Sequence, residues 1–197
     1  MNVAFAGVFA AHVADRVRAR LRIPCEVAVA DDREVTARLG GVVAVRRDPT
    51  RPDPHRLTSV RGPEALEDTL RRADYLAITV ALTPQTRGLI GARELGLMRP
   101  TAILINVARA EVVDEDALYE ALYRGALAGA ALDVWYRYPA GGEPTPPGHR
   151  PFHTLPNVLM TPHVSGWTEG MMDARAAVIA ENIHRVARGE APVNQVK

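Results

Sequence analysis

Short, unbroken apolar runs alternate with segments of helical spacing along most of the chain. In the helical segments, apolar residues recur at intervals of one helical turn, as Val13, Val17 and Leu21 do. The runs predict strands at residues 3–6, 26–30, 42–45, 74–80, 102–105, 128–132 and 158–160, and the helical spacing predicts helices at residues 10–21, 32–39, 63–73, 92–97, 115–124 and 169–188. Strands that are apolar throughout are typical of a parallel sheet covered by helices on both faces. The pattern therefore predicts an α/β fold.

Two stretches show neither pattern. Residues 48–62 are polar and rich in Pro and Arg, so we expect a loop there. Residues 136–156 contain six prolines and three glycines, so we expect an irregular excursion over the surface.

Composition narrows the choice of partners. The chain has 197 residues, of which 47% are hydrophobic, enough for one sizeable domain or two small ones. Its 24 basic and 23 acidic residues nearly balance, so we expect neither a nucleic-acid nor a membrane partner. Cys25 is the only cysteine, which excludes an internal disulfide, and no apolar run is long enough to span a bilayer. We therefore expect a cytoplasmic protein, and no metal site is predicted.

Polar or charged side chains follow four of the predicted strands. They lie in residues 81–90, 106–114, 133–135 and 161–168. The carboxyl ends of parallel strands meet at one edge of a sheet, and ligands of open α/β sheets bind beyond that edge. We therefore expect these four segments to meet at a common crevice.

Each of the four segments contains a motif. They read Leu-Thr-Pro-Gln-Thr-Arg-Gly-Leu-Ile at 82–90, Ile-Asn-Val-Ala-Arg-Ala at 105–110, Leu-Asp-Val at 132–134 and Thr-Pro-His-Val-Ser-Gly-Trp-Thr at 161–168. In this order and spacing, residues 73–186 resemble the cofactor domain of the D-isomer-specific 2-hydroxyacid dehydrogenases. One such motif is weak evidence, but four in order are specific. The resemblance implies a Rossmann-like parallel sheet, an NAD(P) cofactor, and hydride transfer between that cofactor and a small 2-hydroxy or 2-keto acid.

The resemblance also implies roles for individual residues. Arg109 resembles the residue that binds the substrate carboxylate, which a guanidinium can hold through two charge-assisted hydrogen bonds. His163 resembles the acid/base that exchanges a proton with the substrate oxygen, and Asp133 resembles a residue at the nicotinamide end of the cofactor. Further cofactor contacts are implied for Leu82, Thr83, Pro84, Val107, Ala108, Arg109, His163 and Gly166. Taken singly, an Arg or His after a strand is more often a surface or turn residue, so the set carries the prediction.

Two positions near the implied site depart from the family pattern. Tyr138 stands where the family has the glutamate that partners the histidine. A tyrosine hydroxyl can orient the imidazole ring but supplies no charge at neutral pH, so either another acid such as Glu169 replaces the glutamate or the histidine works without one. Ala110 stands where the family has glycine, which is tolerable if the backbone angles there are ordinary.

A larger departure concerns the pyrophosphate site. The family holds pyrophosphate with a G-x-G-x-x-G loop between a strand and a helix, and no such motif occurs in this chain. Gly7 follows the first predicted strand, but Val8 and Phe9 are bulky and the second and third glycines are missing. Binding of the cofactor is therefore in doubt.

The absence of the G-x-G-x-x-G loop suggests how the chain is divided into domains. Residues 1–40 resemble the opening of the family's substrate domain, and residues 41–168 resemble the cofactor domain without its first strand, so the sheet is incomplete at its N-terminal half. Residues 169–197 are expected to form a helix that packs back on the N-terminal segment. The sequence thus looks like a family member with an internal deletion, whether natural or engineered.

The cofactor preference and the activity stay open at this point. Arg46 and Arg47 end the strand that would contact the adenosine ribose, which favours NADP over NAD, unless both are plain surface charges beside Asp48. One hypothesis is an NAD(P)-dependent 2-hydroxyacid dehydrogenase. The other is a catalytically inactive relative that binds no dinucleotide and serves as a folded remnant or interaction module. The family is commonly dimeric, but part of its usual interface lies in the missing stretch, so whether this chain forms a homodimer also stays open.

Overall fold

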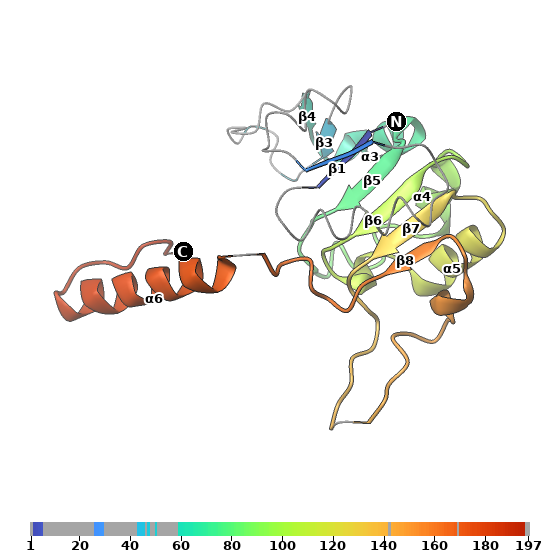
Figure 1. Ribbon diagram of the computed structural model, residues 1–197. Helices are drawn as coiled ribbons and strands as arrows, with labels where there is room; N and C mark the ends of the chain where they lie inside the picture. The colour runs from blue at the N-terminus through green and yellow to red at the C-terminus, as the bar shows by residue number, and fades with distance from the viewer. Residues whose placement is uncertain are drawn as a thin grey trace.

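The centre of the molecule is a four-stranded parallel sheet, seen face-on in Figure 1. The computed structural model describes residues 2–5, 26–29, 43–45, 47, 50, 59–141, 143–168 and 170–195. The sheet has the order β5 (Tyr75–Ile78), β6 (Ile103–Asn106), β7 (Gly129–Leu132) and β8 (Val158–Met160), and every pairing is parallel. The α/β class and the parallel, Rossmann-like sheet are confirmed.

Helices cross over between successive strands. Helix α4 (Ala92–Leu97) joins β5 to β6, and α5 (Glu115–Tyr123) joins β6 to β7. Because the strand order runs in one direction, crossovers of the usual right hand place both helices on the same face, and α4 packs against α5. Helix α3 (Leu66–Arg72), preceded by the 3-10 turn η1 (Pro63–Ala65), packs beside α4. The helices expected at 10–21 and 32–39 lie outside the described residues.

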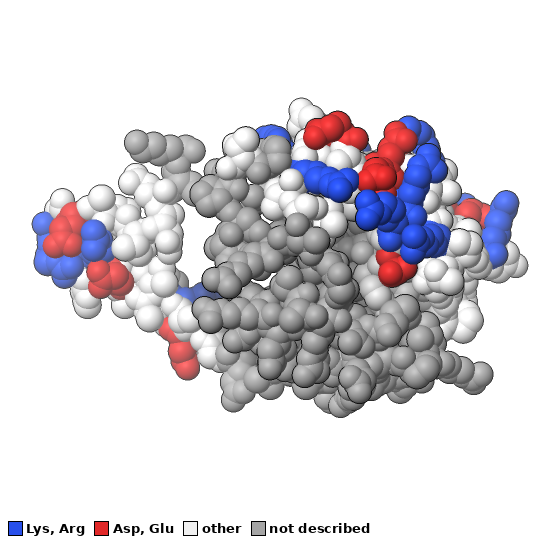
Figure 2. Space-filling view, turned by 90° about the horizontal axis from the view of Figure 1, so that it is seen from above, with Lys and Arg blue, Asp and Glu red and all other residues white. Residues whose placement is uncertain are grey.

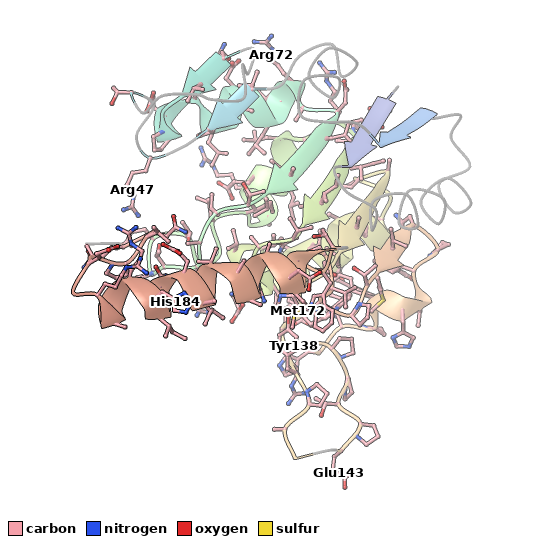
Figure 3. The ribbon with its side chains drawn as sticks, turned by 60° about the vertical axis from the view of Figure 1, so that its left-hand side comes forward. Arg47, Arg72, Tyr138, Glu143, Met172 and His184 are labelled. Carbon is pink, nitrogen blue, oxygen red and sulfur yellow. The ribbon has the colours of Figure 1, made fainter. Side chains whose placement is uncertain are left out.

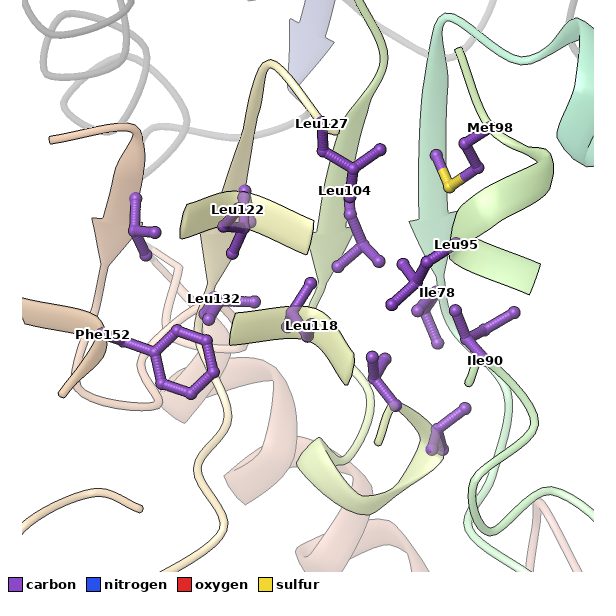
Figure 4. Close-up of a cluster of buried hydrophobic side chains, with 14 of the residues drawn as sticks. Ile78, Ile90, Leu95, Met98, Leu104, Leu118, Leu122, Leu127, Leu132 and Phe152 are labelled. Carbon is purple, nitrogen blue, oxygen red and sulfur yellow. The ribbon is translucent and has the colours of Figure 1, made fainter. Parts of the chain in front are cut away.

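A continuous apolar core lies between this helical layer and the sheet (Figure 4). Leu118 and Leu122 on the inner face of α5 meet Leu104 of β6 and Leu132 of β7, and all four are almost fully buried. Helix α5 begins where the sequence predicts, because the Asp114 side chain accepts a hydrogen bond from the amide of Ala117 at 2.8 Å. This core fixes the positions of the strand ends.

Two further strand pairs precede the sheet. Strand β1 (Asn2–Phe5) pairs in parallel with β2 (Glu26–Val29), and β3 (Val43–Val45) pairs in parallel with β4 (Ser59–Arg61). The prediction of a loop throughout residues 48–62 is wrong for its last part, where β4 lies. A three-residue strand between polar neighbours has no periodicity of its own, and its pairing with β3 depends on a distant segment.

The excursion between β7 and β8 is irregular, as expected, apart from the 3-10 turn η3 (Phe152–Thr154). Glu115 at the start of α5 anchors it by accepting hydrogen bonds from the backbone amides of His149 and Arg150. A Cβ on Gly148 would collide with a Glu115 carboxylate oxygen, so glycine permits this approach. Figure 3 shows the excursion extending from Tyr138 at its root to Glu143 at its tip.

The last helix stands apart from the sheet. Helix α6 (Met171–Ala187) projects away from the body in Figure 1, and none of its residues is buried. Its predicted packing on the N-terminal segment remains a prediction, because residues 6–25 lie outside the described ranges. The same holds for the division of the chain into three domains.

Candidate functional site

The loop after β6 is held by a buried asparagine. Asn106, the last residue of β6, is 2% exposed. Its side-chain oxygen accepts a hydrogen bond from the amide of Ala108 at 3.0 Å, and its side-chain nitrogen donates to the carbonyl of Arg109 at 3.0 Å. These two bonds fold the chain back after the strand. They place Arg109, whose side chain is exposed, at the carboxyl edge of the sheet.

The turn after β8 is held by a buried aspartate at the end of β7. Asp133 is 3% exposed. One of its oxygens accepts hydrogen bonds from the Thr161 hydroxyl at 2.6 Å and the Val164 amide at 2.9 Å, and the other accepts from the Ser165 amide at 2.9 Å. Its own amide donates to the carbonyl of Asn106 at 3.0 Å. Asp133 therefore connects the end of β6 with the turn after β8.

These contacts keep Asp133 ionised. Burial alone would raise the pKa of its carboxyl group, but the hydrogen bonds from Ser165, Thr161 and Val164 stabilise the carboxylate and hold the pKa below its ordinary value. The carboxylate thus acts as a fixed negative anchor at the centre of the edge.

His163 lies at the apex of the turn that Asp133 holds. Its φ angle is +58°, in the left-handed region that residues other than glycine seldom adopt. The hydrogen bonds from the next two residues to Asp133 stabilise this conformation, which projects the exposed imidazole from the edge.

Tyr138 contacts the histidine directly. Its hydroxyl lies 2.8 Å from His163 Nδ1, and it accepts a hydrogen bond from the amide of Trp135 at 3.1 Å. The two ring centroids are 5.6 Å apart. Trp135 is itself fixed, because its indole N–H donates to the carbonyl of Thr161 at 2.9 Å. The structure thus brings Tyr138 to the position of a histidine partner.

The residues expected along the cofactor lie at the same edge. Val107, which lies between Asn106 and Ala108 in the chain, is exposed, whereas Ala108 is buried. Gly166 has open space where a Cβ would stand. After β5, the loop of Leu82, Thr83 and Pro84 is closed by Thr86, whose hydroxyl accepts a hydrogen bond from the amide of Thr83 and donates to the carbonyl of Ala81.

Of the two arginines expected at the ribose, only Arg47 lies within the described residues. Arg47 is exposed just beyond β3, which belongs to a different strand pair from β5–β8. Arg46 lies outside the described residues. Ala110, which stands in place of the family glycine, has no need of unusual backbone, since it lies in the short 3-10 turn η2 (Ala110–Val112).

The sequence predicts the residues at the edge but not the contacts that assemble them. Asn106 belongs to a recognised motif, but only the structure shows that its side chain holds the Arg109 loop through two hydrogen bonds. The partners of Asp133 lie about thirty positions later in the chain, so only the β7–β8 pairing reveals them. A buried polar residue at each of two adjacent strand ends is the signal that could have found both.

On the face that Figure 2 shows, the charges of the described residues are mixed rather than gathered. Arginines form ion pairs with neighbouring acids. Arg61 and Arg72 both pair with Asp68. Arg93 pairs with Glu67, and Arg99 pairs with Asp74 at 3.1 Å. In the described part of the chain, no helix combines the length and apolarity needed to cross a bilayer.

Comparison with known proteins identifies the family. Residues 34–165 match the family described as D-isomer specific 2-hydroxyacid dehydrogenase, NAD binding domain. The chain is 40% identical over 146 residues to D-3-phosphoglycerate dehydrogenase of Methanocaldococcus jannaschii. This match covers 73% of this chain and 26% of that protein. The chain is also 43% identical over 132 residues to glyoxylate reductase of Aeropyrum pernix, and this match covers 67% of this chain and 38% of that protein.

A solved structure gives the same result. The D-isomer specific 2-hydroxyacid dehydrogenase from Xanthobacter autotrophicus Py2, in complex with NADPH and MES, is 30% identical with a TM-score of 0.61, over 100% of this chain and 71% of that chain. This chain thus spans well under half the length of the two relatives matched by sequence. It belongs to the D-isomer specific 2-hydroxyacid dehydrogenase family, within its NAD-binding domain.

Proposed function

We propose that the carboxyl edge of β5–β8 is the site of an oxidoreductase that interconverts a small 2-keto acid and the corresponding 2-hydroxy acid. One observation carries the proposal: Asn106 and Asp133, buried at adjacent strand ends, hold the segments that present Arg109 and His163 at one edge. Arg109 binds the substrate carboxylate through its guanidinium group. His163 exchanges a proton with the substrate oxygen through Nε2, the ring nitrogen that Tyr138 leaves available.

A nicotinamide dinucleotide would supply the hydride in this reaction, and its two ends fit the chain differently. The nicotinamide end fits, since Val107 is exposed and Gly166 is open at the edge. Asp133 would support that end by holding the turn. The pyrophosphate end does not fit, because the chain has no G-x-G-x-x-G loop. If Arg46 and Arg47 contact the ribose phosphate, NADP is preferred to NAD.

The missing loop favours a second candidate function. In this alternative the chain is a folded, catalytically inactive member that binds no dinucleotide and serves as an interaction module. Residues 1–40 would then be the remnant of a substrate domain. The two candidates differ in cofactor binding, which a fluorescence titration with NADPH and NADH measures. Saturable binding supports the first candidate, and no binding at millimolar cofactor supports the second.

Turnover tests the proposed function directly. Glyoxylate and hydroxypyruvate are supplied with NADPH or NADH, and the loss of cofactor absorbance is followed. We expect Arg109→Ala to lower kcat/KM roughly 10- to 100-fold, because charge-assisted hydrogen bonds to the carboxylate are lost. His163→Asn, which tolerates the positive φ angle, should lower kcat by about 100-fold or more. Arg124→Ala, at an exposed arginine paired with Glu120, is the matched control. Turnover that survives Arg109→Ala unchanged would reject the proposal.

A further inference from the structure

The hydroxyl of Tyr138 has two neighbours with different hydrogen-bonding capacities. The backbone amide of Trp135 can only donate, so at 3.1 Å the phenolic oxygen is its acceptor. The other neighbour, Nδ1 of His163 at 2.8 Å, can be either donor or acceptor, depending on the tautomer. The tautomer therefore depends on where the phenolic hydrogen points.

The Trp135 bond directs that hydrogen toward the imidazole. The phenolic oxygen accepts from the amide of Trp135, so the hydroxyl hydrogen points away from that amide. Nδ1 of His163, at 2.8 Å, is within hydrogen-bond distance as its acceptor. An imidazole that accepts at Nδ1 carries its own hydrogen on Nε2 when it is neutral.

A carboxylate would set the opposite arrangement. It has no hydrogen to donate at neutral pH, so Nδ1 must be the donor and neutral Nε2 is left without a hydrogen. In the described part of the chain, no carboxylate makes an ion pair or hydrogen bond with the His163 ring, and Nε2 has no hydrogen-bond partner. The candidate acid Glu169 lies outside the described residues.

We propose that Tyr138 is a positioning residue that holds neutral His163 in the tautomer with its hydrogen on Nε2, so that the site favours a 2-keto acid over the matching 2-hydroxy acid. The substrate preference rests on the proposed function, since it assumes that Nε2 faces the substrate oxygen. A keto oxygen only accepts hydrogen bonds, so it matches an Nε2–H donor. Removing a proton from a hydroxy acid instead requires a bare Nε2, which Tyr138 disfavours.

Nitrogen NMR of the full chain labelled with 15N-histidine tests the tautomer without substrate or cofactor. At a pH where the imidazoles are neutral, we expect His163 to show a protonated Nε2 and a hydrogen-bonded, unprotonated Nδ1. His163→Asn assigns the signals, and the exposed His153 and His184 are internal references for an unconstrained ring. In Tyr138→Phe the His163 signals should move toward those references. In Tyr138→Glu the hydrogen should move to Nδ1.

The control is Tyr123→Phe, at an exposed tyrosine that stacks on Tyr119 in α5 and should leave the His163 signals unchanged. Backbone spectra of each variant show whether the fold is kept. A wild-type ring with its hydrogen on Nδ1, or His163 signals that do not respond to Tyr138→Phe, would overturn the proposal.

Binding of pyruvate and D-lactate, which differ only in oxidation state, tests the consequence. We expect Tyr138→Glu to lower the ratio of pyruvate to lactate affinity roughly threefold to tenfold, the value of one exchanged hydrogen bond. An unchanged ratio with measurable binding would contradict the inferred preference. If neither acid binds, the proposed function fails, while the NMR pattern still decides the tautomer.

Discussion

The loops at the carboxyl edge of the sheet and helix α6 both present exposed side chains, yet they are held in different ways. The loop after β6 is held by the buried side chain of Asn106, and the turn after β8 is held by that of Asp133. Helix α6 has regular backbone hydrogen bonds but no buried residue. Its apolar side chains at Met172, Ile179 and Ile183 are each more than 60% exposed.

The difference shows that local order and tertiary anchoring are separate properties. The edge loops have little regular secondary structure but are fixed by buried groups whose loss leaves partners unsatisfied. Helix α6 is regular, but none of its residues is buried. We therefore expect substitutions in the two regions to differ in their effect on the free energy of unfolding, although both regions face solvent.

The largest effect is expected in the core beneath the edge. Leu104 in β6 is fully buried, so Leu104→Ala should lower the free energy of unfolding by about 2–5 kcal/mol through lost burial and a residual cavity. Chemical denaturation of wild type and variant measures the difference. A loss below about 1 kcal/mol would show that β6 is not central to the core.

The next effect concerns the anchor of the histidine turn. Asp133→Asn keeps the shape of the side chain but removes the charge and turns an amide group toward backbone N–H donors. We expect it to lower the free energy of unfolding by about 1–3 kcal/mol and to weaken proton exchange at His163. Denaturation and turnover are measured together. Asp173→Asn, at an exposed acid on α6, is the control and should change neither quantity.

The pH dependence of stability separates the charge of Asp133 from its shape. Its pKa in the folded protein is lowered from 3.8, so its contribution is complete above the unfolded-state value and is lost as the pH falls through the lower folded-state value. The difference in unfolding free energy between wild type and Asp133→Asn should therefore be constant near neutral pH and shrink in acid below about pH 4. A difference that persists undiminished in strong acid would assign the effect to shape alone.

The smallest effect is expected in α6. Ile179→Ala should change the free energy of unfolding by no more than about 0.5 kcal/mol, because the side chain is exposed. If Ile179→Ala instead lowers the free energy of unfolding by about 2 kcal/mol or more, α6 covers another surface. The predicted packing of this helix on the N-terminal segment would then gain support.

Much of this architecture could be predicted from the sequence because its signals are local. Apolar runs and caps give β5–β8, α4 and α5 nearly residue for residue, and Asp114 marks the start of α5. The site motifs follow the same logic, since each lies directly after a strand. The sequence also shows that Tyr138 replaces the family's glutamate, because that position is counted from the Leu-Asp-Val motif at residues 132–134.

What could not be predicted depends on pairing across distance. The residues of strand β4 have the pattern of a loop, and they form a strand because they pair with β3. The contacts of Asp133 with Val164 and Ser165 need the β7–β8 register, and the bond from Trp135 to Tyr138 needs the fold of the excursion. No periodicity or composition records such contacts.

Amide hydrogen exchange of the full chain tests most directly whether buried anchors hold the edge. The amides of Ala108, Val164 and Ser165 donate to Asn106 or Asp133, so they should exchange slowly, close to the rates of β6. Those of α6 should exchange quickly, as in a helix that lacks tertiary support. Fast exchange at Val164 and Ser165, together with protection of α6 equal to that of β6, would show that Asp133 does not hold the edge.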